Sequence, residues 1–297
     1  MYKRQVSVCV PNSLHKKYTL MALSYGAHVL CEKPAALSRK DAVEMYEYAR
    51  GRGKYLVACQ SMRFTPDRLA AKKLLTNMPD IYYAEFSRIR RRGIPTWGKF
   101  HIKEISGGGA LVDIGVHMLD SVLWLMNNPR VSSVRASVFR NHADEIGTLK
   151  NSGALTGNVY NACEFIPEEM DVEDFSAGTI NFENGATVNF KAAWAANLPD
   201  EASIRLVNKE NGILLPEGRV LSSIDSEEKL YPEQSKYPDE AFAGHFYLVD
   251  NFLEVLQGKA ELIVKPEEII NVSTILELFY KSACLGKEIK VNELEEI

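Results

Sequence analysis

Two short polar segments interrupt apolar stretches of the chain and carry side chains with catalytic chemistry. The first is Glu32-Lys33-Pro34, which directly follows the apolar run 27–31. Proline lacks a backbone donor and keeps the preceding residue in extended geometry, so Lys33 should stand at a strand end. A lysine in that place can bind a substrate hydroxyl or stabilise negative charge on oxygen. The alternative is a solvated lysine at the end of a strand.

The second segment, 107–117, reads Gly-Gly-Gly-Ala-Leu-Val-Asp-Ile-Gly-Val-His. Asp113 and His117 are four residues apart, so on a helix they share one face within hydrogen-bonding range. We expect the carboxylate to orient the imidazole and raise its pKa, making His117 a proton acceptor near neutral pH. The alternative is a buried ion pair or helix cap. A metal site with Asp120 is less favoured, because the chain offers no obvious further ligands.

The elements that must position these residues begin with three predicted strands, 6–10, 27–31 and 55–59, separated by helices. Strand, helix, strand, helix, strand predicts a parallel, doubly wound α/β sheet. Ligands of such sheets bind beyond the carboxyl ends of the strands. Pro11, Asn12 and His15 follow the first strand there, as Glu32 and Lys33 follow the second.

After residue 62 the pattern changes to that of an α+β domain with a large, mostly antiparallel open sheet. Strands are predicted at 81–90, 131–140, 175–182 and 187–194, and the last two flank Asn184-Gly185, a strong hairpin signal. A second Asn-Gly pair, 211–212, predicts another turn. An apolar helix is expected over 110–126, and a closing helix from Pro266 to Gly286. We predict two domains, 1–62 and 63–297.

Composition restricts the class of partner. A formal net charge of −4 argues against binding to nucleic acid or acidic membranes. No apolar run reaches the roughly 18 residues of a membrane span. The five cysteines are isolated and odd in number, which favours reduced thiols in a cytoplasmic protein over a disulfide or zinc framework.

Several motifs together resemble one family. These are Val-Pro-Asn-Ser-Leu-His at 10–15, Gly-Ala-His-Val-Leu-Cys-Glu-Lys-Pro-Ala at 26–35, Gln-Ser-Met-Arg-Phe at 60–64, and Gly-Gly-Gly-Ala-Leu-Val-Asp-Ile-Gly-Val-His-Met-Leu-Asp at 107–120. In order and spacing they resemble the Gfo/Idh/MocA oxidoreductases (glucose-fructose oxidoreductase, inositol dehydrogenase and rhizopine catabolism proteins). The resemblance covers essentially the whole chain.

The resemblance implies a Rossmann domain that binds NAD or NADP, followed by a sheet domain that often forms homo-oligomers. It implies hydride transfer between the nicotinamide and a sugar, inositol or related polyol. Lys33, Asp113 and His117 would then be catalytic, with His117 taking the hydroxyl proton and Lys33 steadying the oxygen. The cofactor site would be formed by Pro11, Asn12, His15, Glu32, Lys33 and Arg63, without a metal.

The chain departs from the family pattern at its start. Family members begin with a strand, a Gly-x-Gly-x-x-Gly turn and a helix, which bind the dinucleotide phosphates; this sequence contains no such turn. About sixty residues, two βαβ steps, would be lacking. We expect either an internal start site, which we favour, or a truncated remnant. The third possibility is a non-catalytic binding or assembly protein on the same fold.

Two further features of the sequence each allow two interpretations. Arg90-Arg91-Arg92 is interpreted either as a site for a substrate carboxylate or phosphate, or as a solvated or interface cluster at a strand end. Trp97 lies in a predicted loop, and its ring is interpreted either as a surface that stacks on a sugar or as an anchor for that loop.

Overall fold

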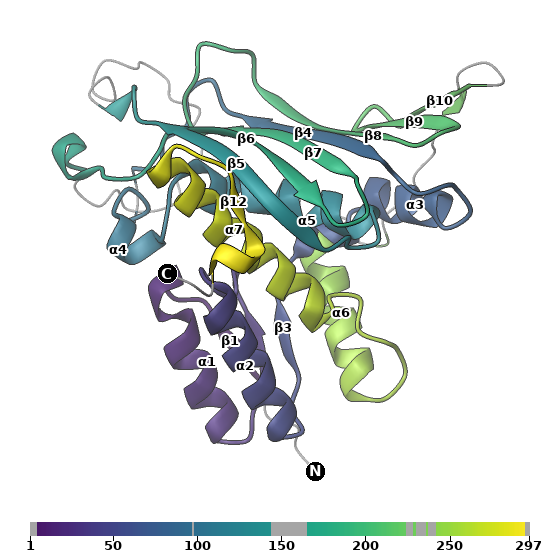
Figure 1. Ribbon diagram of the computed structural model, residues 1–297. Helices are drawn as coiled ribbons and strands as arrows, with labels where there is room; N and C mark the ends of the chain where they lie inside the picture. The colour runs from purple at the N-terminus through teal and green to yellow at the C-terminus, as the bar shows by residue number, and fades with distance from the viewer. Residues whose placement is uncertain are drawn as a thin grey trace.

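The computed structural model describes residues 5–96, 98–143, 165–223, 228–229, 236 and 242–294. Two sheets lie in it one above the other, with helices between them (Figure 1). A small parallel sheet is followed along the chain by a large, mostly antiparallel one, which confirms the predicted fold class. Trp97 lies outside the described residues.

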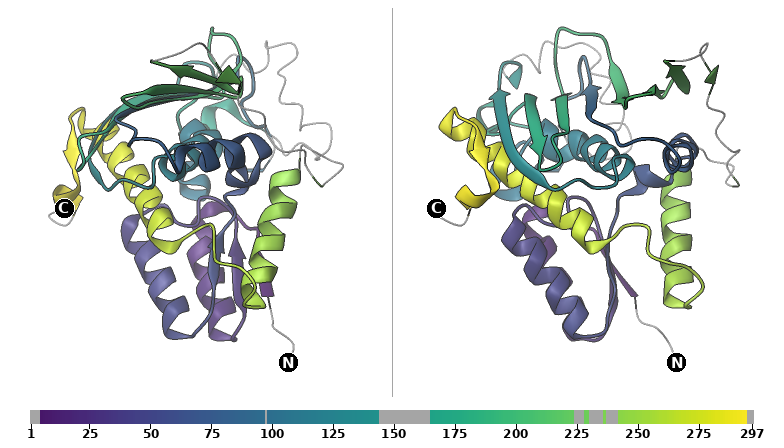
Figure 2. Two further views of the ribbon diagram at one scale, coloured as in Figure 1. Left: turned by 90° about the vertical axis from the view of Figure 1, so that its right-hand side faces the viewer. Right: turned by 45° about the vertical axis from the view of Figure 1, so that its right-hand side comes forward.

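The small sheet has the strand order β1-β2-β3, with β1 at Gln5–Val8, β2 at His28–Cys31 and β3 at Leu56–Ala58. Both strand pairs are parallel, as predicted. Helices α1 (His15–Ser24) and α2 (Arg39–Gly51) lie on one face and α6 (Ala243–Leu256) on the other (Figure 2). The Ser38 hydroxyl caps α2 by accepting a hydrogen bond from the Asp41 amide.

The large sheet has nine described strands in the order β11-β10-β9-β8-β4-β7-β6-β5-β12. Of the neighbouring pairs within this order, β4 and β7 run parallel and the others antiparallel. Their bounds are β4 Tyr83–Ile89, β5 Val131–Phe139, β6 Phe175–Phe182, β7 Thr187–Ala193, β8 Glu201–Val207, β9 Asn211–Leu215, β10 Arg219–Ser222, β11 Glu228–Lys229 and β12 Ile289–Lys290.

The two Asn-Gly pairs behave differently. Gly185 has φ +85° and turns the β6–β7 hairpin as predicted. The second pair was wrongly predicted to turn the chain, because Asn211 and Gly212 are the first residues of β9. The preceding turn is held instead by the Asn208 side-chain oxygen, which accepts hydrogen bonds from the Glu210 and Asn211 amides.

Helices cover one face of the large sheet and leave the other open (Figures 1 and 2). The described helices not yet given are α3 Pro66–Leu75, α4 Lys103–Ser106, α5 Val116–Leu125, α7 Pro266–Leu285 and the short turns η1 Asn12–Leu14, η2 Ser61–Phe64, η5 Pro167–Glu169 and η6 Val291–Leu294. A π-helical turn, η3 at Leu111–Gly115, precedes α5. The segment Lys103–Leu125, which contains α4, η3 and α5, is long and apolar enough to cross a membrane, but 89% of its apolar window is buried inside the protein.

The closing helices connect the two sheets. Leu248 and Phe252 of α6 and Ile269 of α7 belong to the apolar core of the small sheet. Farther along α7, Leu276 and Phe279 belong to the core of the large sheet. The division of the chain into domains at residues 1–62 and 63–297 remains a prediction. Helices α6 and α7, which come after residue 62 in the chain, contribute side chains to the core of the small sheet.

A buried ion-pair network ties η2 to α5 and α7. The Arg63 guanidinium donates to both Asp120 carboxylate oxygens, at 2.7 and 2.6 Å, and also to Glu268. The side chains of Arg63 and Asp120 are completely buried. Removing one partner from such a pair leaves the other charge without adequate compensation in an apolar environment.

We therefore expect Asp120→Asn to lower the free energy of unfolding by about 3 kcal/mol, as measured by denaturant titration. Lys287→Ala, which breaks an exposed pair with Glu293, is the control and should cost less than about 1 kcal/mol. Equal small losses in both variants would show that the network contributes little.

Candidate active site

The ends of β2 and η3 bring the two predicted polar segments together. The Lys33 ammonium donates to the backbone oxygen of Asp113 at 2.5 Å and to its carboxylate at 3.2 Å. These residues are 80 positions apart in sequence, and their side chains are only 15% and 16% exposed. Since an ammonium has three donors, one remains for another oxygen. Lys33 is thus held at the carboxyl end of the small sheet and is not a freely solvated lysine.

Trp194, which sequence reasoning missed, completes the environment of Asp113. It follows β7, is completely buried, and its indole N–H donates to the second Asp113 carboxylate oxygen at 2.9 Å. The carboxylate is therefore bound from both sides. Nothing in the spacing of Trp194 indicates this role, because the contact depends on how the large sheet packs on η3.

His117 lies one turn beyond Asp113, but the expected hydrogen bond between them is absent among the described residues. Its Nδ1 is buried and has no hydrogen-bond partner there. The Asp113 carboxylate oxygens accept from Lys33 and from Trp194. The prediction of a raised pKa was wrong. Burial lowers the pKa of His117 well below its ordinary value, and the nearby charges of Lys33, His245 and Arg88 lower it further. The imidazole is consequently neutral and able to accept a proton.

The triple glycine is required by close packing around the start of η3. A β-carbon on Gly108 would collide with the Tyr280 hydroxyl, and one on Gly109 with the backbone of Glu173. The buried Glu173 carboxylate accepts hydrogen bonds from the Gly109 and Leu111 amides, at 2.9 and 3.1 Å, and from the Tyr280 hydroxyl. These bonds satisfy the free amides at the start of the helical stretch that carries Asp113 and His117. Sequence reasoning also missed Glu173.

The residues predicted to bind the cofactor separate into two groups. Pro11 and Asn12 lie after β1 and Glu32 after β2, at the same edge of the sheet as Lys33. The Asn12 side-chain amide donates to the Ser106 carbonyl at 2.7 Å, which joins this edge to the segment before η3. Glu32 accepts a hydrogen bond from the Lys33 amide.

His15 and Arg63 do not fit the predicted cofactor role. His15 is 1% exposed, and its two ring nitrogens lie 2.8 and 2.9 Å from the Pro34 and Val10 carbonyls. It therefore joins the loops after β1 and β2 and presents no surface to a ligand. The Arg63 guanidinium is enclosed in the ion-pair network with Asp120 and Glu268. Both residues are structural supports.

The described residues contain no group of three or more metal-ligating side chains. Asp120, considered as a possible ligand beside Asp113 and His117, is occupied by Arg63. The arrangement can instead bind a hydroxyl oxygen through the Lys33 ammonium while the neutral His117 accepts its proton.

Known proteins and protein-family models similar to this chain identify its family. Residues 4–59 match the family model described as an oxidoreductase family with an NAD-binding Rossmann fold, and residues 79–213 match the GFO/IDH/MocA C-terminal domain. D-glucoside 3-dehydrogenase of Escherichia coli is 32% identical over 96% of this chain and 79% of its own length. The chain belongs to the Gfo/Idh/MocA family. It is thus a member of an NAD-binding family of oxidoreductases.

Other relatives and solved structures extend the likeness. A putative UDP-kanosamine synthase oxidoreductase subunit of Amycolatopsis mediterranei is 29% identical over 66% of this chain and 53% of its own. Aldose-aldose oxidoreductase of Caulobacter crescentus has a TM-score of 0.76 at 22% identity, covering 97% of this chain and 79% of that one. Levoglucosan dehydrogenase in complex with NADH and levoglucosan has a TM-score of 0.77 at 19% identity, covering 97% and 80%. These two solved structures share its fold.

The residues at the edge of the small sheet have a position and chemistry compatible with one end of a dinucleotide. Three parallel strands end there side by side, and the Lys33 ammonium retains a free donor at that edge. Pro11, Asn12, Glu32 and Lys33 would hold the nicotinamide half.

The lowered pKa of His117 predicts a pH dependence of stability. The unfolded chain takes up a proton at this residue near pH 6.5 while the folded chain does not, so stability should fall as the pH drops below about 6.5. The added slope is at most about 1.4 kcal/mol per pH unit. Denaturant unfolding between pH 7.5 and 5 should show a shallower dependence for His117→Gln than for the native chain. Identical slopes would contradict a neutral buried imidazole.

Proposed function

We propose that this chain contributes the catalytic centre of a dehydrogenase that transfers hydride between a nicotinamide dinucleotide and a hydroxyl-bearing carbon of a sugar or polyol. The observation that carries the proposal is the Lys33 ammonium, fixed by Asp113 with one donor left, beside a neutral His117. The names of the relatives, which include a glucoside dehydrogenase, an inositol dehydrogenase and levoglucosan dehydrogenase, support this substrate class.

Each residue has a separate task in this proposal. Lys33 binds the reacting oxygen and stabilises the negative charge that develops on it. His117 accepts the hydroxyl proton, for which its neutral form is required. Asp113 holds Lys33 and is itself held by Trp194, so it acts as a positioning residue and not as the partner of His117. The dinucleotide, when bound, supplies the hydride acceptor.

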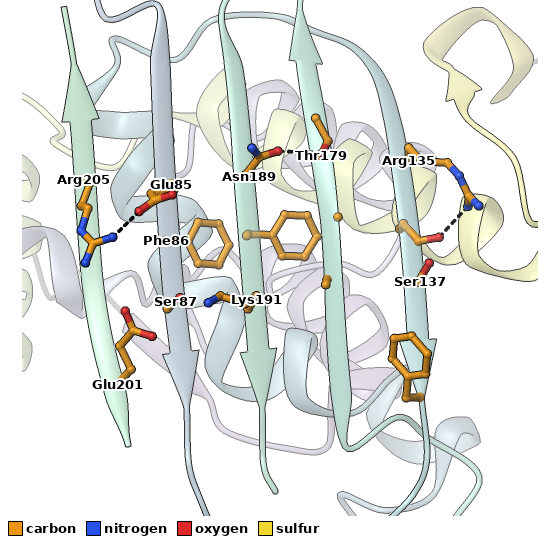
Figure 3. A pocket seen from close by; sticks show the side chains of 15 residues that line it. Glu85, Phe86, Ser87, Arg135, Ser137, Thr179, Asn189, Lys191, Glu201 and Arg205 are labelled. Atoms are coloured by element: carbon orange, nitrogen blue, oxygen red, sulfur yellow. Dashed lines mark hydrogen bonds and ion pairs between the residues drawn. The ribbon is translucent and has the colours of Figure 1, made fainter. Parts of the chain in front are cut away.

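We further propose that copies of the chain associate through the open face of the large sheet. This face contains a shallow hollow of about 520 Å³ crossed by β8, β4, β7, β6 and β5 (Figure 3). The Glu85–Arg205 ion pair and the exposed Lys191 lie on it, together with Phe139, whose exposure is 47%. Mixed polar and apolar lining of this kind is typical of protein interfaces. Sedimentation velocity showing only monomer at micromolar concentration would reject the association.

A cytoplasmic location is proposed from the cysteines. Cys9, Cys31, Cys59 and Cys284 are free thiols in the described chain. Free thiols without disulfides are typical of proteins in reducing compartments.

Variants of Lys33 and His117 test the proposed chemistry. With NAD⁺ or NADP⁺ and methyl glucosides, levoglucosan or inositols as substrates, Lys33→Met and His117→Asn should each lower kcat/KM by about 100- to 10,000-fold. His117→Asn should leave the Kd for NADH, measured by cofactor fluorescence, within about threefold of the native value, since His117 acts on the substrate. Lys287→Met, at an exposed site, is the matched control. Undiminished turnover in His117→Asn would reject its role as the base.

A further inference from the structure

Arg88 occupies the inner face of the large sheet, at the end of β4 nearest η3. Side chains alternate along a strand, so Arg88 points to the same face as Ala84 and Phe86, which belong to the buried core. Its register partner in β7 is Ala192. Gly115 packs so closely on Ala192 that a β-carbon on Gly115 would lie 2.8 Å from the Ala192 β-carbon. Arg88 therefore stands beside the helical turn that joins Asp113 to His117.

The electrostatic environment of His117 places Arg88 in the same region. Among the basic groups that lower the pKa of His117 are Lys33, from the small sheet, and Arg88, from the large one. Asp113 and Asp200 are in turn among the charges that act on Arg88. Together with the register of Arg88 on Ala192 and the packing of Gly115 on Ala192, these interactions place Arg88 on the large-sheet side of the proposed reaction centre.

Arg88 is half-buried, yet its guanidinium has no hydrogen bond or ion pair with any residue in the described ranges. Other arginines of the region are bound: Arg68 pairs with Asp67, and Arg90 donates to the Gly93 carbonyl. Burial lowers the pKa of Arg88, and the like charges of Arg90 and Arg68 lower it further, although a guanidinium remains protonated. A half-buried cation without a partner is an energetically unfavourable arrangement that an anionic ligand would relieve.

We propose that Arg88 recognises a carboxylate on the substrate, and that the preferred substrates are sugar or polyol acids. The planar guanidinium can bind a carboxylate through two parallel hydrogen bonds, a geometry that a neutral hydroxyl cannot match. The carboxylate would lie against β4 while Lys33 and His117 reach the reacting hydroxyl from the other side. The proposal rests on the proposed dehydrogenase function for the identity of the ligand as a substrate.

The Arg90–Arg92 cluster considered from the sequence is less suited to this task. Arg91 and Arg92 are fastened to the loop after β7: the Arg91 amide donates to Asp200, and the Arg92 guanidinium donates to Asn197 and to the Ala196 carbonyl. Arg88, which has no partner in the described ranges, is available to a ligand. It lies inside β4, two positions before Arg90.

Calorimetric titration of the chain with D-glucuronate, D-glucose and D-glucose 6-phosphate tests the proposal without requiring turnover. We expect D-glucuronate to bind more tightly than D-glucose by tenfold or more, since hydrogen bonds between charged groups are the stronger ones. Arg88→Gln should weaken D-glucuronate binding by about 10- to 100-fold and change D-glucose binding less than about threefold. Arg88→Lys keeps the positive charge but cannot form two parallel hydrogen bonds to a carboxylate. Its affinity for D-glucuronate should therefore lie between those of the native chain and Arg88→Gln. Arg92→Gln is the matched control and should bind like the native chain.

Several results would overturn the proposal. These are equal affinity for D-glucuronate and D-glucose, no D-glucuronate binding at millimolar concentration, or equal weakening of both sugars in Arg88→Gln. A dependence on Arg88 seen only with the phosphate ester would overturn the carboxylate assignment. If Arg88 governs D-glucuronate binding but only neutral sugars reduce the cofactor, the assignment of sugar acids as substrates fails and the proposed dehydrogenase function stands. If neither sugar acids nor neutral sugars reduce the cofactor, the dehydrogenase function fails and Arg88 remains a carboxylate-binding residue. Thermal unfolding within a few degrees of the native chain verifies that each variant is folded.

Discussion

The contact between Lys33 and Asp113 is the constraint on which the arrangement of the site depends. It joins the carboxyl edge of the small parallel sheet to the helical stretch beneath the large sheet. Both side chains are largely removed from water, where an unpaired charge is costly. The two sheets must therefore dock in one register, and α7, which enters both apolar cores, helps to hold them there.

Supports on each side keep this contact in place. His15 fastens the Lys33 side by bridging the loops after β1 and β2, and Glu173 fastens the Asp113 side by binding the free amides before η3. The Asp113 carboxylate accepts hydrogen bonds from Lys33 and Trp194, and within the described residues the His117 Nδ1 makes none. The neutral state of His117 consequently follows from burial and basic neighbours, and a paired carboxylate is unnecessary.

The elements of the fold were largely predictable because periodicity and turn residues are local signals. The parallel strands, the Asn184-Gly185 hairpin and the closing helix up to Gly286 all followed from them. Lys33, Asp113 and His117 could be selected because polar residues interrupted apolar runs. Their mutual contacts could not be predicted, because the partner of each side chain depends on how segments 80 positions apart in the sequence pack together. Trp194, Glu173 and Arg88 were missed for the same reason, and Arg63 was misassigned because nothing local reveals its buried partners.

A double-mutant cycle between Lys33 and Asp113 on the rate of hydride transfer tests the central claim most directly. Single-turnover rates would be measured for Lys33→Met, Asp113→Asn and the double variant, with a deuterated substrate to verify that the hydride step is observed. If Asp113 acts by holding Lys33, the double variant should be about as slow as Lys33→Met alone, since coupled residues are not additive. Fully additive losses would show that the two residues act independently and would contradict the account.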